Sequence, residues 1–199
     1  MNPVHAYNNL LSLKRIFDSL NTQFWLDEGT ALGAWRGNDF IEGDGDIDIG
    51  FLGECDYILP QLMEELKSDG WHYFNLNEHP CGEGKQLSCI RLNISVDISL
   101  YYLRGDKRWR CMFDRPPNKE VRYFACVYPK SLYDNLSEVN FLEAGTMFLV
   151  PPKEFLVLQY GNWEVPDPNF RWQWDYKSQD LQWEFTPKDQ KNNQQKEIS

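Results

Sequence analysis

The sequence predicts an α+β domain in which helices flank a mixed sheet. Three observations favour this class. Apolar residues recur at helical spacing near the start of the chain, short apolar runs typical of strands dominate its middle, and a chain of 199 residues has the length of one domain. We therefore expect one domain over residues 1–186, followed by a polar tail over 187–199 that we expect to be disordered.

The first half of the chain alternates helical and strand patterns. Leu10, Leu13, Ile16 and Phe17 follow helical spacing, and Gly29 precedes a short helical segment. We expect, in chain order, a helix over 5–20, a strand over 24–26, a helix over 30–35, a strand over 47–52 and a helix over 57–66.

The second half reads mainly as strands. We expect them over 71–74, 87–92, 94–102, 108–113, 121–127 and 147–150. Pro151 and Pro152 then suit the start of a helix that continues to about Tyr160, because proline is tolerated in the first helical turn.

The strand over 47–52 follows an unusual run of carboxylates. Side chains alternate between the two faces of a strand, so we expect Asp44, Asp46 and Asp48 on one face and Ile47 and Ile49 in the core. Aligned like charges cost free energy unless a cation lies among them, and Mg²⁺ (or Mn²⁺) prefers such oxygen ligands. A charged surface strand would produce the same spacing.

A third acid, Asp97, lies between apolar residues in another expected strand. A neighbouring position in the sheet would place it beside Asp46 and Asp48 as a metal ligand or as the base that accepts a hydroxyl proton. Gly29 permits close approach of a phosphate to the start of the following helix, and Thr30 offers a hydroxyl there. Arg36 offers a guanidinium for a phosphate, or an ion pair with an acid close by in the sequence.

These segments together resemble the LicD family, which includes fukutin and the fukutin-related protein. The family signature runs approximately Gly-Gly-Thr-Leu-Leu-Gly-x-x-Arg, followed by Phe-Ile-Pro-Trp-Asp-Asp-Asp-Ile-Asp. The matching segments here are 28–36 and 40–48, and the later family aspartate corresponds to Asp97. A late Tyr-Gly-Asp-Trp-like element corresponds to residues 160–163.

The resemblance implies a nucleotidyltransferase-like fold in which Asp46, Asp48 and Asp97 bind Mg²⁺. It also implies a transferase that moves a phospho-substituent, such as phosphocholine or a polyol phosphate, from a CDP-linked donor to a glycan hydroxyl. Gly29, Thr30 and Arg36 would then hold the donor phosphates.

Two positions depart from the family pattern and keep other functions open. Glu28 replaces the first glycine of the signature, and Gly45 replaces its middle acid. The alternatives are a nucleotidyltransferase that uses a nucleoside triphosphate and a non-catalytic module that binds a nucleotide or a sugar.

Two aromatic residues are further candidates for substrate binding. Tyr160 and Trp163 suit stacking on a base or sugar, and they suit packing of the last helix equally well. We expect the basic residues of the middle of the chain to lie on solvated strand faces; they are Lys85, Arg91, Arg104, Lys107, Arg108 and Arg110.

Composition excludes several classes of function. The net charge of −10 argues against nucleic acid as a partner. Five scattered cysteines without a CxxC pair indicate reduced thiols. Because no leader peptide and no apolar span are visible in the sequence, we expect a cytoplasmic protein without a transmembrane segment. A zinc site at His79, Cys81 and Cys89 would need a further ligand, so incidental thiols are the favoured interpretation.

Overall fold

The computed structural model describes residues 1–115, 120–171 and 175–185. Its elements in chain order are α1 (Pro3–Ser19), β1 (Trp25–Leu26), α2 (Glu28–Gly37), β2 (Asp46–Leu52), the 3₁₀ turn η1 (Gly53–Ile58), α3 (Leu59–Ser68), β3 (His72–Glu78), β4 (Lys85–Arg91), β5 (Ile94–Arg104), β6 (Lys107–Asp114), β7 (Arg122–Pro129), α4 (Ser131–Asp134), β8 (Ser137–Asn140), η2 (Phe141–Glu143), β9 (Met147–Val150) and α5 (Lys153–Tyr160).

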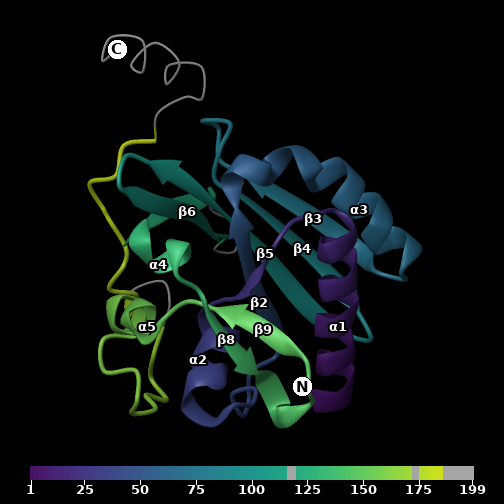
Figure 1. Cartoon of the computed structure of the whole chain (residues 1–199). Helices are drawn as coiled ribbons and strands as arrows, with labels where there is room; N and C mark the ends of the chain where they lie inside the picture. The colour runs from purple at the N-terminus through teal and green to yellow at the C-terminus, as the bar shows by residue number, and fades with distance from the viewer. Residues whose placement is uncertain (116–119, 172–174, 186–199) are drawn as a thin grey trace.

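The sheet is mixed and holds nine strands within the described residues. The order β3-β4-β5-β2-β1-β9-β8 forms its main path, and β6 and β7 extend it from the end of β5. The β2–β5 and β1–β9 pairs are parallel, whereas the remaining neighbours on the path are antiparallel. Helices α1 and α3 lie next to each other beside the sheet (Figure 1). The predicted α+β class with a mixed sheet is therefore confirmed.

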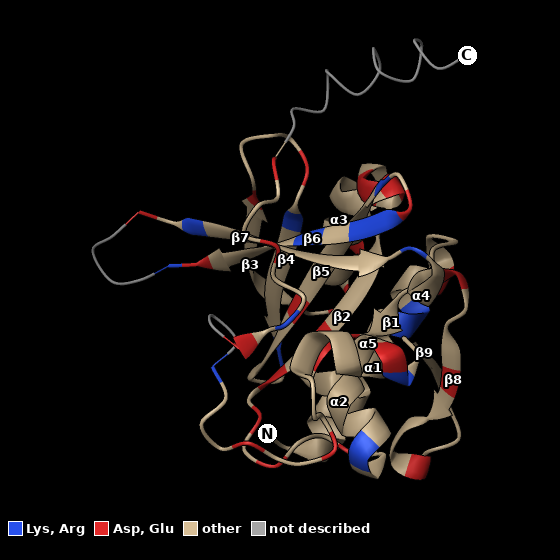
Figure 2. Cartoon of the chain, turned by 90° about the vertical axis from the view of Figure 1, so that its left-hand side faces the viewer, with Lys and Arg blue, Asp and Glu red and all other residues tan. Residues whose placement is uncertain are grey.

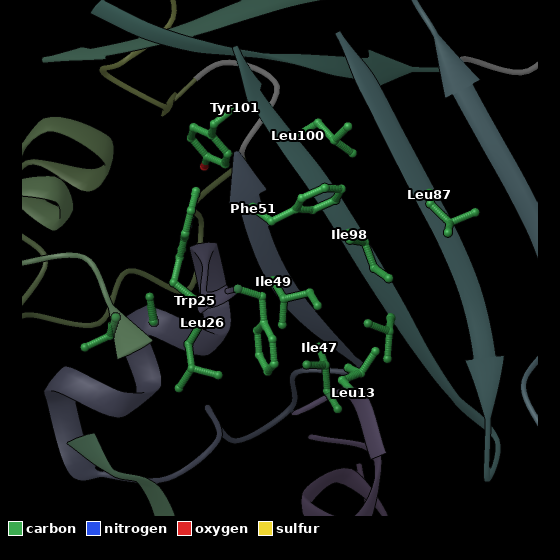
Figure 3. Packing of buried hydrophobic residues seen from close by; sticks show 14 of the residues in the cluster. Leu13, Trp25, Leu26, Ile47, Ile49, Phe51, Leu87, Ile98, Leu100 and Tyr101 are labelled. Carbon is green, nitrogen blue, oxygen red and sulfur yellow. The ribbon is translucent and has the colours of Figure 1, made fainter. Parts of the chain in front are cut away.

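The core forms where β2 packs against α1. Ile47, Ile49 and Phe51 of β2 are fully buried, and Leu13 of α1 lies beside Ile47 (Figure 3). Phe17 of α1 contacts the Phe51 ring edge-on, with ring centroids 5.5 Å apart. Burying the odd-numbered β2 residues on this face leaves Asp46 and Asp48 to face the opposite side.

Several element boundaries differ from the sequence-based expectations. Helix α1 begins at Pro3, because the side chain of Asn2 accepts hydrogen bonds from the backbone N–H groups of Val4 and His5 at 3.0 and 3.2 Å. The sequence analysis missed α4 and β8. In β8 half-buried and exposed residues alternate without a clear apolar pattern, so periodicity carried no signal.

Asp44 lies outside the acidic strand, although it lines the same cavity as Asp46 and Asp48, as expected from the sequence. Strand β2 begins at Asp46, and the backbone N–H of Asp44 donates to the carbonyl of Ile41 at 3.1 Å in the preceding turn. The tail over 187–199 lies outside the described residues.

Candidate active site

Two neighbouring strands bring three carboxylates together. The parallel pairing of β2 with β5 places Asp48 opposite Asp97, and Asp46 lies two residues before Asp48 on the same face. One carboxylate oxygen from each of the three lies within 4.8 Å of the others. These acids line a cavity of about 530 Å³, here called the acid cavity, beside the start of α2. Figure 2 shows acidic positions in this part of the sheet in red.

Hydrogen bonds from neighbouring elements fix this geometry. The backbone N–H of Gly29 donates to Asp48 Oδ2 at 3.2 Å, and the N–H of Asp48 donates to Thr30 Oγ1 at 2.9 Å. On the other side, Ser88 Oγ of β4 donates to Asp97 Oδ1 at 2.5 Å. Thr30 is 1% exposed and is not among the residues that line the acid cavity, and its hydroxyl ties α2 to β2.

Burial and mutual repulsion raise the pKa values of the three carboxylates. Burial raises the pKa of Asp46 to about 6, with further contributions from a hydrogen bond and the charge of Asp44. Burial likewise raises the pKa of Asp97 to about 6, against the opposing hydrogen bond from Ser88. The pKa of Asp48 lies well above its ordinary value, through burial first and then the charges of Glu28, Asp46 and Asp97.

This donor set fits a hard divalent cation. Three clustered carboxylates supply only oxygen ligands, which Mg²⁺ and Mn²⁺ prefer over the nitrogen and sulfur ligands typical of zinc. A cation among them would offset the repulsion that raises their pKa values. The three residues therefore suit a divalent metal.

Glu28, the departure at the first glycine of the signature, has a buried cationic partner. Its backbone has a positive φ of 37°, and its carboxylate forms an ion pair with Arg110 and accepts a hydrogen bond from Tyr176 Oη at 2.6 Å. Burial alone would lower the pKa of Arg110, but the charge of Glu28 raises it well above its ordinary value. Glu28 borders the acid cavity, and Arg110 offsets part of its charge.

The expectation that the middle basic residues lie on solvated faces was wrong for two of them. Arg110 is 0% exposed and Arg108 is 5% exposed. Arg108 pairs with Glu54 at 2.9 Å, so both arginines are buried beside a carboxylate. Strand periodicity alone could not reveal partners that lie so far away in the sequence.

Arg36 lies away from the carboxylates. Its Nε donates to the carbonyl of Trp163 at 2.6 Å, and one Nη donates to that of Val165 at 3.4 Å. It lines a second cavity of about 500 Å³, here called the side cavity, together with Trp163. Tyr160 lines both cavities.

The family follows from comparison with known proteins. The model of the LicD/FKTN/FKRP family, described as a nucleotidyltransferase domain, matches residues 21–153. The chain belongs to this family. The family resemblance predicted from segments 28–36 and 40–48 is therefore confirmed, and the matched region corresponds to the nucleotidyltransferase domain of that family.

Relatives of this LicD-family chain include two proteins of Rickettsia. The uncharacterized protein RT0683 of Rickettsia typhi is 29% identical over 114 residues, which cover 57% of this chain and 33% of that protein. RP689 of Rickettsia prowazekii is 35% identical over 51 residues, 26% of this chain and 19% of that protein. The chain thus matches a third or less of each relative.

Among solved structures, the chain is similar to ANT(2″)-Ia in complex with adenylyl-2″-tobramycin. The sequence identity is 18%, the TM-score is 0.38, and the match covers 51% of this chain and 52% of that one.

The sequence of this LicD-family member did not reveal several residues of the acid cavity. Beside the acids, the lining includes Gln86 of β4, Met112 and Phe113 of β6, and Phe170, Arg171 and Tyr176 from the segment after α5. They come from three separate regions of the chain, and no motif in the sequence marks them. Arg171 places a guanidinium at a cavity otherwise rich in carboxylates.

Two further expectations concern metal and membrane. The acid cluster is the one group of three or more potential metal ligands in the described ranges, so His79, Cys81 and Cys89 do not form a zinc site there. His79 Nδ1 instead accepts a hydrogen bond from the backbone N–H of Cys81 at 3.1 Å. None of the helices in the described residues is both apolar enough and long enough to span a bilayer.

Proposed function

We propose that this LicD-family enzyme moves a phospho-substituent from a CDP-linked donor to a glycan hydroxyl, with Mg²⁺ or Mn²⁺ as cofactor. The observation that carries the proposal is the convergence of three carboxylates on paired strands beside the glycine at the start of α2. Phosphoryl transfer demands mainly alignment and neutralisation of charge, and this arrangement suits both demands.

Asp46, Asp48 and Asp97 would hold the cation in this proposal. When bound, the metal neutralises phosphate charge and lowers the pKa of a coordinated hydroxyl. Gly29 would let the donor phosphates approach the backbone closely, because it has no Cβ in the space next to Asp44 and Asp48. Arg171 at the cavity would contribute a further cation toward the phosphates.

Asp97 is the proposed base. Ser88 donates to its Oδ1, and this fixes the orientation of the carboxylate. Asp97 would accept the proton of the acceptor hydroxyl while the hydroxyl oxygen forms a bond to phosphorus. The bond between that phosphorus and CMP breaks, and CMP leaves with the bonding electron pair.

The proposal is tested by product analysis with CDP-choline, Mg²⁺ and a panel of oligosaccharide acceptors. We expect release of CMP and an acceptor whose mass increases by one phosphocholine. Asp48→Asn should abolish turnover while the fold persists, whereas Asp18→Asn, at a 63%-exposed side chain, should leave turnover unchanged. A nucleotide adduct formed from CTP would favour nucleotidyl transfer instead, and full turnover by Asp48→Asn would refute the assigned site.

A further inference from the structure

The side cavity adjoins the acid cavity. The two share four lining residues, Leu32, Ile41, Tyr160 and Phe170, so they form neighbouring compartments of one cleft. The side cavity lies between α2 and the segment that follows α5, and these two segments are far apart in the sequence.

The chemistry of the two compartments differs. The acid cavity holds five carboxylate residues in its lining, whereas Asp167 is the one carboxylate among the described residues that line the side cavity. The lining of the side cavity instead includes the aromatic residue Trp163, the amide residue Asn162 and the cationic residue Arg36. Such a set suits a planar, polar-edged group without negative charge of its own.

The wall of the side cavity is held in place by Arg36. Its guanidinium donates to the carbonyls of Trp163 and Val165, which ties the segment after α5 to α2. The ammonium of Lys153 lies 5.8 Å from the centroid of the Trp163 ring. Trp163 is therefore positioned before a ligand arrives, which reduces the entropy lost on binding.

The spacing of the compartments matches a substrate that reaches from one to the other. Gly29 at the acid cavity and Arg36 at the side cavity lie seven residues apart on α2, about 10 Å along the helix axis. The reacting phosphate and the acceptor hydroxyl must both reach the carboxylates. The remote compartment consequently suits a part of the donor that takes no part in bond making.

We infer that the side cavity binds the nucleobase of the donor nucleotide, with Trp163 as an aromatic wall and Asn162 as a hydrogen-bonding partner for the edge of the base. This inference rests on the proposed function, because it takes the donor phosphates to lie in the acid cavity. Aromatic rings stack on any base, and an amide both donates and accepts hydrogen bonds.

Calorimetric titration of the full chain in the presence of Mg²⁺ tests the inference. The probes are CDP and ADP, which carry a base, and inorganic pyrophosphate, which does not. We expect at least one nucleotide to bind at least tenfold more tightly than pyrophosphate. Trp163→Phe and Asn162→Ala should each weaken binding of that nucleotide threefold to tenfold and leave pyrophosphate binding unchanged.

Matched controls distinguish the side cavity from general effects. Trp183→Phe alters a half-buried tryptophan that packs on Trp109, and Asn8→Ala alters an exposed residue of α1, so both should bind like the wild type. Asn162 is exposed, so Asn162→Ala remains informative even if Trp163→Phe does not fold.

The outcomes separate the two proposals. Equal affinity for nucleotides and pyrophosphate, or equal losses for both ligands in Trp163→Phe and Asn162→Ala, would overturn the inference and leave the proposed function standing. Pyrophosphate binding that does not depend on Mg²⁺ and is unchanged in Asp48→Asn would overturn the proposed function itself.

Discussion

Helix α2 carries three glycines whose replacement by alanine should have three different effects. A Cβ on Gly29 would lie 2.7 Å from Asp44 Oδ2 and 3.4 Å from Asp48 Oδ2. A Cβ on Gly33 would lie 2.3 Å from the backbone carbonyl oxygen of Asp39, and one on Gly37 would meet no atom within 4 Å. The same substitution in one helix therefore tests function, packing and helix propensity separately.

Gly29→Ala should change ligand binding more than stability. Alanine gains up to about 1 kcal/mol in helix propensity over glycine. The close contact of the new Cβ is with the end of the flexible, half-buried Asp44 side chain, which can move. The free energy of unfolding of Gly29→Ala should therefore stay within about 1 kcal/mol of the wild type. The new methyl group would occupy the space through which a phosphate approaches, and Mg²⁺-dependent pyrophosphate affinity should fall tenfold or more, about 1.4 kcal/mol.

The other two glycines serve as controls. Gly33→Ala forces a backbone carbonyl to move and should lower the free energy of unfolding by about 1–3 kcal/mol. Gly37→Ala should preserve binding and raise the free energy of unfolding by up to about 1 kcal/mol, because its Cβ meets no atom and alanine has the higher helix propensity. Chemical denaturation and calorimetric titration measure the two quantities for each variant. If Gly29→Ala binds pyrophosphate as well as Gly37→Ala does, phosphates do not approach the start of α2 and the reasoning fails.

Three further predictions concern buried polar groups. Arg110→Met should lower the free energy of unfolding by about 3–5 kcal/mol, because it leaves the Glu28 carboxylate buried without its cation. Adding Glu28→Gln should recover part of this loss. If denaturation shows that the effects of the two substitutions are strictly additive, the predicted coupling is contradicted. Thr30→Val should cost about 1–3 kcal/mol, because the N–H of Asp48 loses its acceptor, and an unchanged denaturation midpoint would argue against that bond. Burial raises the pKa of Asp27 from 3.8 to about 6, so between these pH values the native metal-free protein binds more protons than the unfolded chain. The contribution of Asp27 to the free energy of unfolding therefore falls as pH rises, by at most about 3 kcal/mol. Asp27→Asn should remove this part of the pH dependence, and parallel pH profiles for the variant and the wild type would refute the prediction.

The local patterns of the sequence were sufficient for the elements with clear periodicity. The spacing of Leu10, Leu13, Ile16 and Phe17 predicted α1, and the alternation of Ile47 and Ile49 with Asp46 and Asp48 predicted β2 and the face that its acids occupy. Burial repeats every second residue in a strand, so one buried face dictates the direction of the other.

Short and irregular elements were less predictable. β8 shows no clear apolar alternation, and the turn before β2 removed Asp44 from the strand. Pairing with β9 determines β8, and a local hydrogen bond from the N–H of Asp44 to the carbonyl of Ile41 determines the turn; apolar alternation marks neither.

The sequence by itself identified Asp46, Asp48 and Asp97 as candidates for the acid cluster, because each lies next to a buried apolar residue and matches the family pattern, whereas the pairing of β2 with β5 brings them together. Only the tertiary structure decided that Arg110 pairs with Glu28, that Thr30 holds β2, and that Arg36 fastens the segment after α5. Each of these contacts joins residues from different elements, and the free energy that selects such partners arises from burial and charge in three dimensions.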